Sequence, residues 1–390
     1  MHRSAPRVAI VGGGIAGLFT ANALLRNEIP VTVFEQARAL GEIGAGVFLT
    51  PNGVRQLERI GVSGAVERVG VRVGHASRYH RDNGTEIATV QVTDSAGWNA
   101  VFGMHRADLV ELLAGQLPEG VVRTGHRCVG LTQTDGGARL EFEDGSEADA
   151  DVVIGADGIH SALREQVVPP ATPVFSGSVA YRGLVPHRLV PDWPDDAWHM
   201  WLGEGRHFLT FPVRRGELVN YVAFVPAAAE MRESWSAPGD PDQLRREFSG
   251  WDERIGTLLS HVTETLRWGL YDRDPISTWT AGRLTLLGDA AHPMLPHLGQ
   301  GANQAMEDGM ALATVLADAT AADAPARLQV YERLRRDRVG EVQRGARANG
   351  LRYDSAYEDL EVRDAEMRAH VEFRKWIYDY DVVEHAAEAA

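Results

Sequence analysis

The pattern of apolar residues over the first 35 positions predicts a strand, a helix and a second strand. Val8–Val11 is a short apolar run of the kind that is buried in parallel sheets. Ile15–Arg26 has the length and composition of a helix, and Val31–Phe34 is a second β-branched apolar run. A helix between two such strands is the usual parallel βαβ connection. We therefore expect the chain to begin with an α/β unit.

A different pattern occupies residues 174–235, where aromatic and β-branched runs alternate with short turns. The predicted strands are Val174–Val185, Ala197–Trp201, Arg206–Val213 and Leu218–Val225. Together with the loosely alternating segment Ser77–Val92, they indicate an antiparallel sheet in a second domain. Between the two patterns, Val121–Val129, Gly130–Asp135 and Ala138–Phe142 are predicted to form a β-meander.

Two later segments return to the α/β pattern. The strand Asp151–Ile154 is predicted to lead through Gly-Ala-Asp-Gly into a helix, and Arg283–Leu287 leads through Gly-Asp into a loop and the helix Gln304–Ala317. Asp157 and Asp289 thus follow buried strands at their carboxyl ends. Ligands of open α/β sheets bind at that edge, so both aspartates are candidate binding residues.

The length of the chain indicates more than one domain. At 390 residues it exceeds the ~250–300 residues at which a single hydrophobic core stops growing. We expect an α/β fold in which a discontinuous Rossmann-like domain is interleaved with a β-sheet substrate domain and followed by C-terminal helices. The predicted boundaries are 1–75, 100–173 and 276–345 for the first domain, 76–99 and 174–275 for the second, and 346–390 for the helical extension.

The loop after the first strand carries the glycine spacing of a dinucleotide-binding fingerprint. Gly12 would allow the tight turn, Gly14 the close approach of a pyrophosphate, and Gly17 the close packing of helix on strand. Glu35 ends the second predicted strand, where its carboxylate can accept hydrogen bonds from ribose hydroxyls. The helix N-terminus adds free N–H groups and partial positive charge for phosphates.

Composition and charge exclude several classes of function. The net charge of −15, from 39 basic and 54 acidic residues, argues against a nucleic-acid or anionic-membrane surface. The single cysteine, Cys128, excludes an internal disulfide and the paired cysteines of a disulfide reductase. No run approaches the ~20 apolar residues of a membrane span. We expect a protein of the reducing cytoplasm, without a membrane or nucleic-acid partner.

Three signatures stand together in this order: GGGIAG with Glu35, GADGIHSALR at 155–164, and LGDAAHPMLPHLGQGANQAMEDG at 287–309. This set resembles the single-component (class A) FAD-dependent aromatic monooxygenases, such as salicylate hydroxylases, 3-hydroxybenzoate 6-hydroxylases and 6-hydroxynicotinate 3-monooxygenases. The resemblance runs through residues 7–345 and implies the FAD-binding fold of the para-hydroxybenzoate hydroxylase type. Residues 176–275 resemble the family more loosely.

The resemblance implies a role for each matched residue. Gly12, Gly14, Gly17 and Glu35 would hold the ADP part of FAD, Arg106 would lie near its phosphates, and Asp157 would help bind FAD and the nicotinamide donor. Asp289 would bind the ribityl chain or a ribose. Gly299, Gly301, Ala302 and Asn303 would bring backbone N–H groups and a helix N-terminus to the flavin ring.

The family reaction implied for this chain uses NADH or NADPH as co-substrate. The reduced FAD adds oxygen at its C4a position, and the hydroperoxide hydroxylates a small phenolic or hydroxypyridine carboxylic acid. No second glycine fingerprint follows a strand, so a separate nicotinamide domain is not expected. The protein must then ionise the substrate, because forming a phenolate at pH 7 from a phenol with a pKa of about 10 costs roughly 4 kcal/mol.

Two of the 14 histidines are candidates for the base that ionises the substrate. His207 matches the strand histidine proposed as base in relatives, and His297 lies in the loop beside the expected flavin ring. Candidate substrate contacts are Arg182, Phe211, Tyr221 and Pro296, with Phe211 standing where relatives often carry tyrosine. A metal site at His292 and His297 is not expected, since the loop between them supplies no further ligand.

Two alternatives to the small-acid hydroxylase remain open. The same scaffold could serve a tailoring oxygenase or an epoxidase that acts on a larger natural product or antibiotic. From a different class, the chain could be a non-catalytic flavin-binding protein. The ring position attacked, the choice between NADH and NADPH, and a monomeric or homodimeric state are also open, although the acidic, aromatic tail after residue 355 could form a dimer surface.

Overall fold

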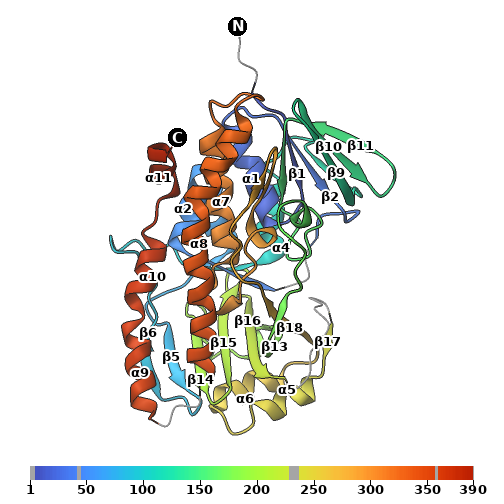
Figure 1. Cartoon of the computed structure of the whole chain (residues 1–390). Coiled ribbons are helices and arrows are strands. Elements are labelled where there is room, and N and C mark those ends of the chain that lie inside the picture. Colours follow the sequence, from blue (N-terminus) through green and yellow to red (C-terminus); the bar gives the residue numbers. More distant parts are fainter. Residues whose placement is uncertain (1–4, 42–44, 228–236, 356–358, 390) are drawn as a thin grey trace.

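The computed structural model describes residues 5–41, 45–227, 237–355 and 359–389. Figure 1 shows a parallel sheet with its helices in the upper half and a larger sheet in the lower half. The long helix α8 (Ala324–Asp354) runs beside both halves and joins them along one side of the molecule (Figure 1). The C-terminal helices flank the same side.

The upper sheet is built from segments that are far apart in the sequence. Its order is β19 (Thr280–Ala281), β20 (Leu284–Leu286), β12 (Val152–Gly155), β1 (Val8–Val11), β2 (Val31–Glu35) and β8 (Val122–Thr124). All neighbours pair in parallel except β19 and β20. Every residue of β1 and β12 is buried, as expected for strands that helices cover on both faces. The carboxyl ends of β1, β2, β12 and β20 therefore meet at one edge.

The helices and small sheet of this half complete the first hydrophobic core. The helices are α1 (Ile15–Arg26), α2 (Pro51–Arg59), α3 (Ser63–Val69), α4 (Arg106–Ala114) and α7 (Gly301–Leu316). The small antiparallel sheet has the order β3 (Gly46–Leu49), β7 (Phe102–His105) and β4 (Val71–Arg72). Helix α1 lies directly against α7, so the first and third sequence signatures are packed together.

The lower sheet has eight strands and contains the strands expected in residues 174–235. Its order is β17 (Pro238–Gly239), β18 (Thr265–Asp272), β13 (Val174–Pro186), β16 (Leu218–Pro226), β15 (Arg206–Val213), β14 (His199–Gly203), β5 (Arg78–Arg81) and β6 (Glu86–Thr89). Helices α5 (Pro241–Glu247) and α6 (Glu253–Ser260) cover one face. Because side chains alternate along a strand, the opposite face is left for contact with the upper half.

Two local predictions were wrong. Residues 121–129 do not form the first strand of a meander, because Val122–Thr124 joins the parallel sheet beside β2. The three-stranded sheet instead contains β9 (Cys128–Thr134), β10 (Gly137–Phe142) and β11 (Glu147–Ala150). The helix expected after Asp157 is only the short 3₁₀ turn Arg164–Gln166. There the side chains of Asp157 and Ser161 accept backbone N–H groups, which favours a looped chain over a helix.

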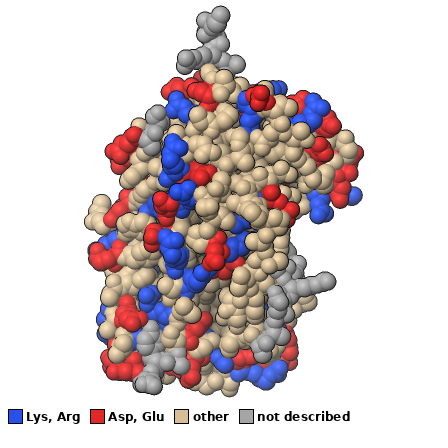
Figure 2. Space-filling model, viewed as in Figure 1, with Lys and Arg blue, Asp and Glu red and all other residues tan. Residues whose placement is uncertain are grey.

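The C-terminal helices return to both halves. Helix α9 (Leu360–Ala369) packs on β6, α10 (Val371–Tyr378) lies against α2, and α11 (Val382–Ala389) packs on α7. Among the described helices, none combines the length and the apolar character needed to cross a membrane. On the face drawn in Figure 2, acidic and basic side chains lie interspersed. The cytoplasmic location and the monomeric or homodimeric state stay predictions.

Candidate active site

The three glycines of the fingerprint have three different surroundings. Gly12 adopts a φ of +113°, and a Cβ there would lie 2.2 Å from the carbonyl oxygen of Ala156. A Cβ at Gly17 would lie 1.9 Å from the carbonyl oxygen of Gly12. At Gly14, by contrast, a Cβ would meet no atom within 4 Å among the described residues. Gly12 and Gly17 are thus required by the protein itself, whereas Gly14 faces open space at the start of α1.

Glu35 closes the other side of this space. Its Oε2 accepts a hydrogen bond of 2.7 Å from the N–H of Gly13, and its Oε1 accepts one of 2.7 Å from the N–H of Ala37. The carboxylate therefore fixes the turn between β1 and α1. It also lines a cavity of about 300 Å³ together with Gly13 and Gly14.

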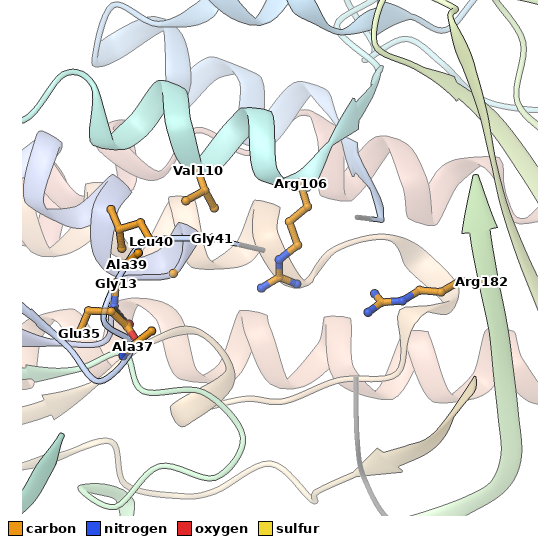
Figure 3. Close-up of a pocket in the computed structure, with 10 residues that line it drawn as sticks. Gly13, Glu35, Ala37, Ala39, Leu40, Gly41, Arg106, Val110 and Arg182 are labelled. Carbon is orange, nitrogen blue, oxygen red and sulfur yellow. Dashed lines mark hydrogen bonds between the residues drawn. The ribbon is translucent and has the colours of Figure 1, made fainter. Parts of the chain in front are cut away.

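Two arginines reach this cavity from different elements. Figure 3 shows Arg106, at the start of α4, and Arg182, on β13, with their guanidinium groups directed into the same space. Arg182 is buried and its guanidinium carbon lies 4.4 Å from the ring centroid of Trp268. The cavity thus extends from the glycine turn toward the lower sheet and carries positive charge where the two halves meet.

The second and third signatures are tied together by Arg164. Its Nη1 donates to the carbonyl oxygens of Ala290 and Ala291, at 2.7 and 3.1 Å, in the loop that follows β20. Asp157 belongs to the second signature, and its Oδ2 accepts the N–H of Ala162 at 2.9 Å. Burial raises the pKa of Asp157, and its Oδ1 is a buried atom that accepts no hydrogen bond from the described residues.

Asp289 lies beside the N-terminus of α7. Its Oδ1 is 4.0 Å from the position of a Cβ at Gly301, the first residue of that helix, and Ala302 follows it. The enclosing protein raises the pKa of Asp289, and the nearby positive groups of His292 and Arg106 oppose that rise. The carboxylate remains open to solvent in this recess.

The turn before α7 is held by Asn303. Its Nδ2 donates to the carbonyl oxygens of Gly299, at 2.8 Å, and Phe48, at 2.9 Å, while its Oδ1 accepts the N–H of Thr50 at 3.0 Å. Gly299 adopts a φ of +64°, which favours glycine. Asn303 therefore fixes the loop on the protein side, and the first N–H groups of α7 are left for another partner.

His207 lies on the face of the lower sheet that is turned away from α5 and α6. Its Nδ1 is 2.6 Å from Oδ1 of Asp354, the last residue of α8, and its ring stacks on Phe224 at a centroid distance of 4.0 Å. The imidazole is fully buried, and its Nε2 has no hydrogen-bond partner among the described residues. The ring of His297 lies 5.2 Å away between centroids.

The structure brings His297 to the same place from the opposite half. It belongs to the short turn Pro296–Leu298, and its ring packs against Gly350 of α8 and Phe224 of β16. Burial, with a smaller contribution from His207, lowers the pKa of His297 to about 3. His297 is therefore neutral at physiological pH.

The candidate substrate contacts separate into two groups. Arg182 and Phe211 share the sheet face of His207, and Phe211 packs against Gly46 and Phe48. Pro296 is exposed at the turn that carries His297. Tyr221 instead lies on the other face, in the hydrophobic cluster with α5 and α6, and burial raises its pKa to about 12. The geometry thus brings Arg182, Phe211 and Pro296 to the side of the two histidines and leaves Tyr221 apart.

Several residues of the site were missed in the sequence. Asp354 lies in no signature, Arg164 ends the second signature without indicating its contact with Ala290, and Asn220, whose Oδ1 accepts the N–H of Gly46 at 2.8 Å, lies in no signature either. Their partners are 147, 126 and 174 residues away, so no sequence spacing could have paired them. No cluster of three or more metal-ligating side chains occurs among the described residues.

The residues present fit an extended dinucleotide such as FAD. Gly14 leaves room at a helix N-terminus, Glu35 and Asp289 place carboxylates at either end, and Arg106 adds a cation between them. The orphaned Oδ1 of Asp157 provides a further acceptor, and the backbone N of the same residue lies beside Gly12. These groups come from all three sequence signatures.

Comparisons with known proteins agree with this geometry. A family described as FAD binding domain matches residues 6–346. The chain is 40% identical over 389 residues to a 3-amino-4-hydroxybenzoate 2-monooxygenase of Streptomyces platensis, which covers 97% of each chain. It is 35% identical over 412 residues to a salicylate hydroxylase of Pseudomonas putida, covering 98% of this chain and 94% of the relative.

Solved structures show the same fold. A salicylate hydroxylase in complex with its substrate superposes with a TM-score of 0.87 at 33% identity, covering 99% of this chain and 98% of the other. Klebsiella pneumoniae HpxO with FAD and uric acid gives a TM-score of 0.80 at 27% identity, covering 98% and 96%. From its three signatures and these relatives, the chain belongs to the FAD-dependent aromatic monooxygenases.

Proposed function

We propose that this enzyme hydroxylates a small aromatic acid that carries a phenolic or equivalent ring hydroxyl. The observation that carries the proposal is the buried imidazole of His207, which lies on the same sheet face as the guanidinium of Arg182. One group removes a proton and the other binds an anion, and an ionisable aromatic acid needs both. The curated relatives named for 3-amino-4-hydroxybenzoate and salicylate support this substrate class.

Each residue at the cleft has a proposed role. Gly12, Gly14, Gly17 and Glu35 bind the ADP part of FAD, while Arg106, Asp157 and Asp289 bind its phosphates and hydroxyls. The loop Gly299–Asn303 presents the N-terminus of α7 to the flavin ring. FAD, held by these residues, would supply the redox chemistry with NADH or NADPH and oxygen. The chain's own residues ionise the substrate, orient it and exclude water.

The geometry favours His207 over His297 as the base. A general base works best when its pKa lies near the operating pH. His297 has its pKa lowered to about 3, so it is a poor acceptor for a phenolic proton. His207 has its Nδ1 2.6 Å from the carboxylate of Asp354, which leaves Nε2 to accept a proton from the substrate. We propose that His297 orients the substrate hydroxyl from the flavin side.

The distribution of aromatic residues supports a small substrate over a large natural product. Phe211 fills the junction of the two halves, where its ring would be 2.5 Å from a Cβ at Gly46. The ring centroid of Phe48 lies 5.6 Å from that of Phe211, and Trp198 packs on the Phe48 ring at 6.3 Å. We propose that this packing restricts the site to a substrate with a single small ring.

The test is a substrate panel with the purified, FAD-loaded enzyme. 3-Amino-4-hydroxybenzoate, salicylate and 6-hydroxynicotinate are each mixed with NADH or NADPH, and hydroxylated product and hydrogen peroxide are measured in parallel. We expect at least one acid to give product in proportion to the nicotinamide oxidised. His207→Ala should retain FAD and lose product, while the exposed His75→Ala should behave as the parent enzyme. A panel that yields peroxide and no product contradicts the proposal.

A further inference from the structure

The end of the long helix α8 is fixed beside the strand that carries His207. The carbonyl oxygen of Asp354 accepts a 2.9 Å hydrogen bond from the N–H of Gly205, and its side chain reaches Nδ1 of His207 at 2.6 Å. Asp354 therefore binds this part of the sheet through both its backbone and its side chain. The position of the carboxylate is set by the sheet as well as by the helix.

The contact with Asp354 determines which ring nitrogen of His207 carries the hydrogen. A carboxylate can only accept a hydrogen bond, so Nδ1 must be the protonated ring nitrogen. Nε2 is then the lone-pair atom, and it is buried without a partner among the described residues. The ring stacks on Phe224 at a centroid distance of 4.0 Å and makes a T-shaped contact with Tyr353 at 5.2 Å. The imidazole therefore presents one acceptor atom in one orientation.

Only one end of the pair reaches water. The side chain of His207 is 0% exposed, whereas that of Asp354 is 22% exposed. Among the described residues, ring contacts bring two further titratable groups to the imidazole, His297 and Tyr353, and both are buried. Asp354 is thus the member of the pair through which a proton can leave.

We propose that Asp354 is a positioning residue for the reaction, which holds His207 in the Nδ1–H tautomer and connects it to solvent. The substrate O–H bond breaks as Nε2–H forms, and the proton on Nδ1 passes through the Asp354 carboxylate to water. The net change is one phenolate formed and one proton released to solvent. This inference rests on the proposed function, because it deepens the role given there to His207.

The first test measures the tautomer directly and needs no substrate. The purified holoenzyme is labelled with ¹⁵N-histidine, and long-range ¹H–¹⁵N spectra identify which ring nitrogen of His207 carries hydrogen, with His207→Gln supplying the assignment. We expect Nδ1–H in the parent protein. In Asp354→Asn, a side chain of equal size whose amide can donate to Nδ1, we expect the Nε2–H tautomer to gain population. A parent protein with hydrogen on Nε2 overturns the inference.

The second test uses the acid that the panel identifies. It measures coupling, which is the share of the oxidised nicotinamide that yields hydroxylated product. Asp354→Asn should lower product formation by about tenfold or more while leaving the FAD dissociation constant within about twofold. Asp354→Glu should restore part of the loss. The control Glu361→Gln removes a carboxylate from α9 that pairs with Arg81 and should change neither quantity. If Asp354→Asn keeps the parent tautomer and the parent coupling, the inference fails.

The two tests separate this inference from the proposed function. An Nδ1–H tautomer that is lost in Asp354→Asn supports the pairing even if no acid in the panel is hydroxylated, in which case the proposed function alone fails. Should Asp354→Ala prove unstable, Asp354→Asn retains the size of the side chain, and circular dichroism confirms its fold before either measurement.

Discussion

Nε2 of His292 lies 2.5 Å from Oδ2 of Asp308, and both side chains are buried. The same carboxylate oxygen accepts the N–H of Gly288, and Oδ1 accepts Nε of Arg335 at 2.8 Å. Asp308 thus ties the loop after β20 to α7 and α8 at once. Burial opposes the charged carboxylate, but His292 and Arg335 together outweigh it and lower the pKa of Asp308.

Replacing Arg335 should strongly destabilise the protein. Its guanidinium is fully buried and also bonds Glu307 at 2.6 Å and Gln304 at 2.8 Å. Arg335→Gln would remove the guanidinium that the buried carboxylates of Glu307 and Asp308 share, which costs about 3–5 kcal/mol of unfolding free energy. Urea denaturation measures the loss. As a control, the exposed pair of Arg139 with Asp149 should contribute less than about 1 kcal/mol in Arg139→Gln. If Arg335→Gln lowers the unfolding free energy by less than about 1 kcal/mol, the stabilising role of Arg335 is contradicted.

The two glycines of the first turn should respond differently to alanine. Gly14→Ala places its methyl in open space with an ordinary φ of −79°, so the apoprotein should keep the parent melting temperature while FAD binds more weakly. Gly12→Ala forces a positive φ and a contact of 2.2 Å with Ala156, so it should destabilise the apoprotein as well. Fluorescence titration with FAD and thermal melts of both apoproteins separate the effects. Equal melting temperatures for the two variants would argue against this distinction.

Stability should fall as the solution is acidified from about pH 6.5 toward pH 4. Burial lowers the pKa of His199 to about 3 and that of His80 to about 4, and their rings share a 3.0 Å contact. The unfolded chain, with histidine near pKa 6.5, binds protons that the folded pair refuses, so acid favours unfolding by up to about 2 kcal/mol per histidine at pH 5. Urea midpoints at pH 7.5, 6 and 5 test this.

The matched variants for this pH dependence are His199→Gln and His75→Gln. The first should flatten the decline of the urea midpoint with acid, and the second, at an exposed site, should leave it unchanged. An unaltered decline in His199→Gln would place the acid sensitivity elsewhere.

Arg182→Gln should distinguish a substrate contact from a cofactor contact. A lost charge-assisted bond to the substrate carboxylate raises KM by about 10–100-fold. An analogue without the carboxylate should show the same KM in parent and variant. The exposed Arg188→Gln serves as control. If FAD affinity falls instead of substrate affinity, Arg182 belongs to the cofactor.

The elements around the first turn could be predicted because their signals are local. Strand β1, helix α1 and strand β2 lie where the apolar pattern placed them, and the Gly12–Gly14–Gly17 spacing gave the turn. The prediction of a helix after Asp157 was wrong because the side chains of Asp157 and Ser161 accept backbone N–H groups of this segment. Such competition between side chain and helix is hard to weigh from apolar pattern alone.

Which side chains of the lower sheet face the substrate depends on the register of its strands, and the apolar pattern does not specify that register. Alternation says that neighbouring residues of β16 face opposite ways, but not which of them faces the flavin. The register pairs His207 with Phe224 and Thr210 with Tyr221, and this places Tyr221 behind the sheet. Asp354 approaches His207 because α8 extends to residue 354, and no motif in the sequence marks that end of the helix.

The order of strands in the upper sheet constrains how the enzyme can be synthesised. Strand β1 emerges from the ribosome first, yet its neighbour β12 follows about 140 residues later and β20 later still. The helix that would face the flavin begins only at Gly301. A nascent polypeptide therefore cannot capture FAD until most of its length has been translated, and the earliest apolar strand must be shielded from aggregation during that interval.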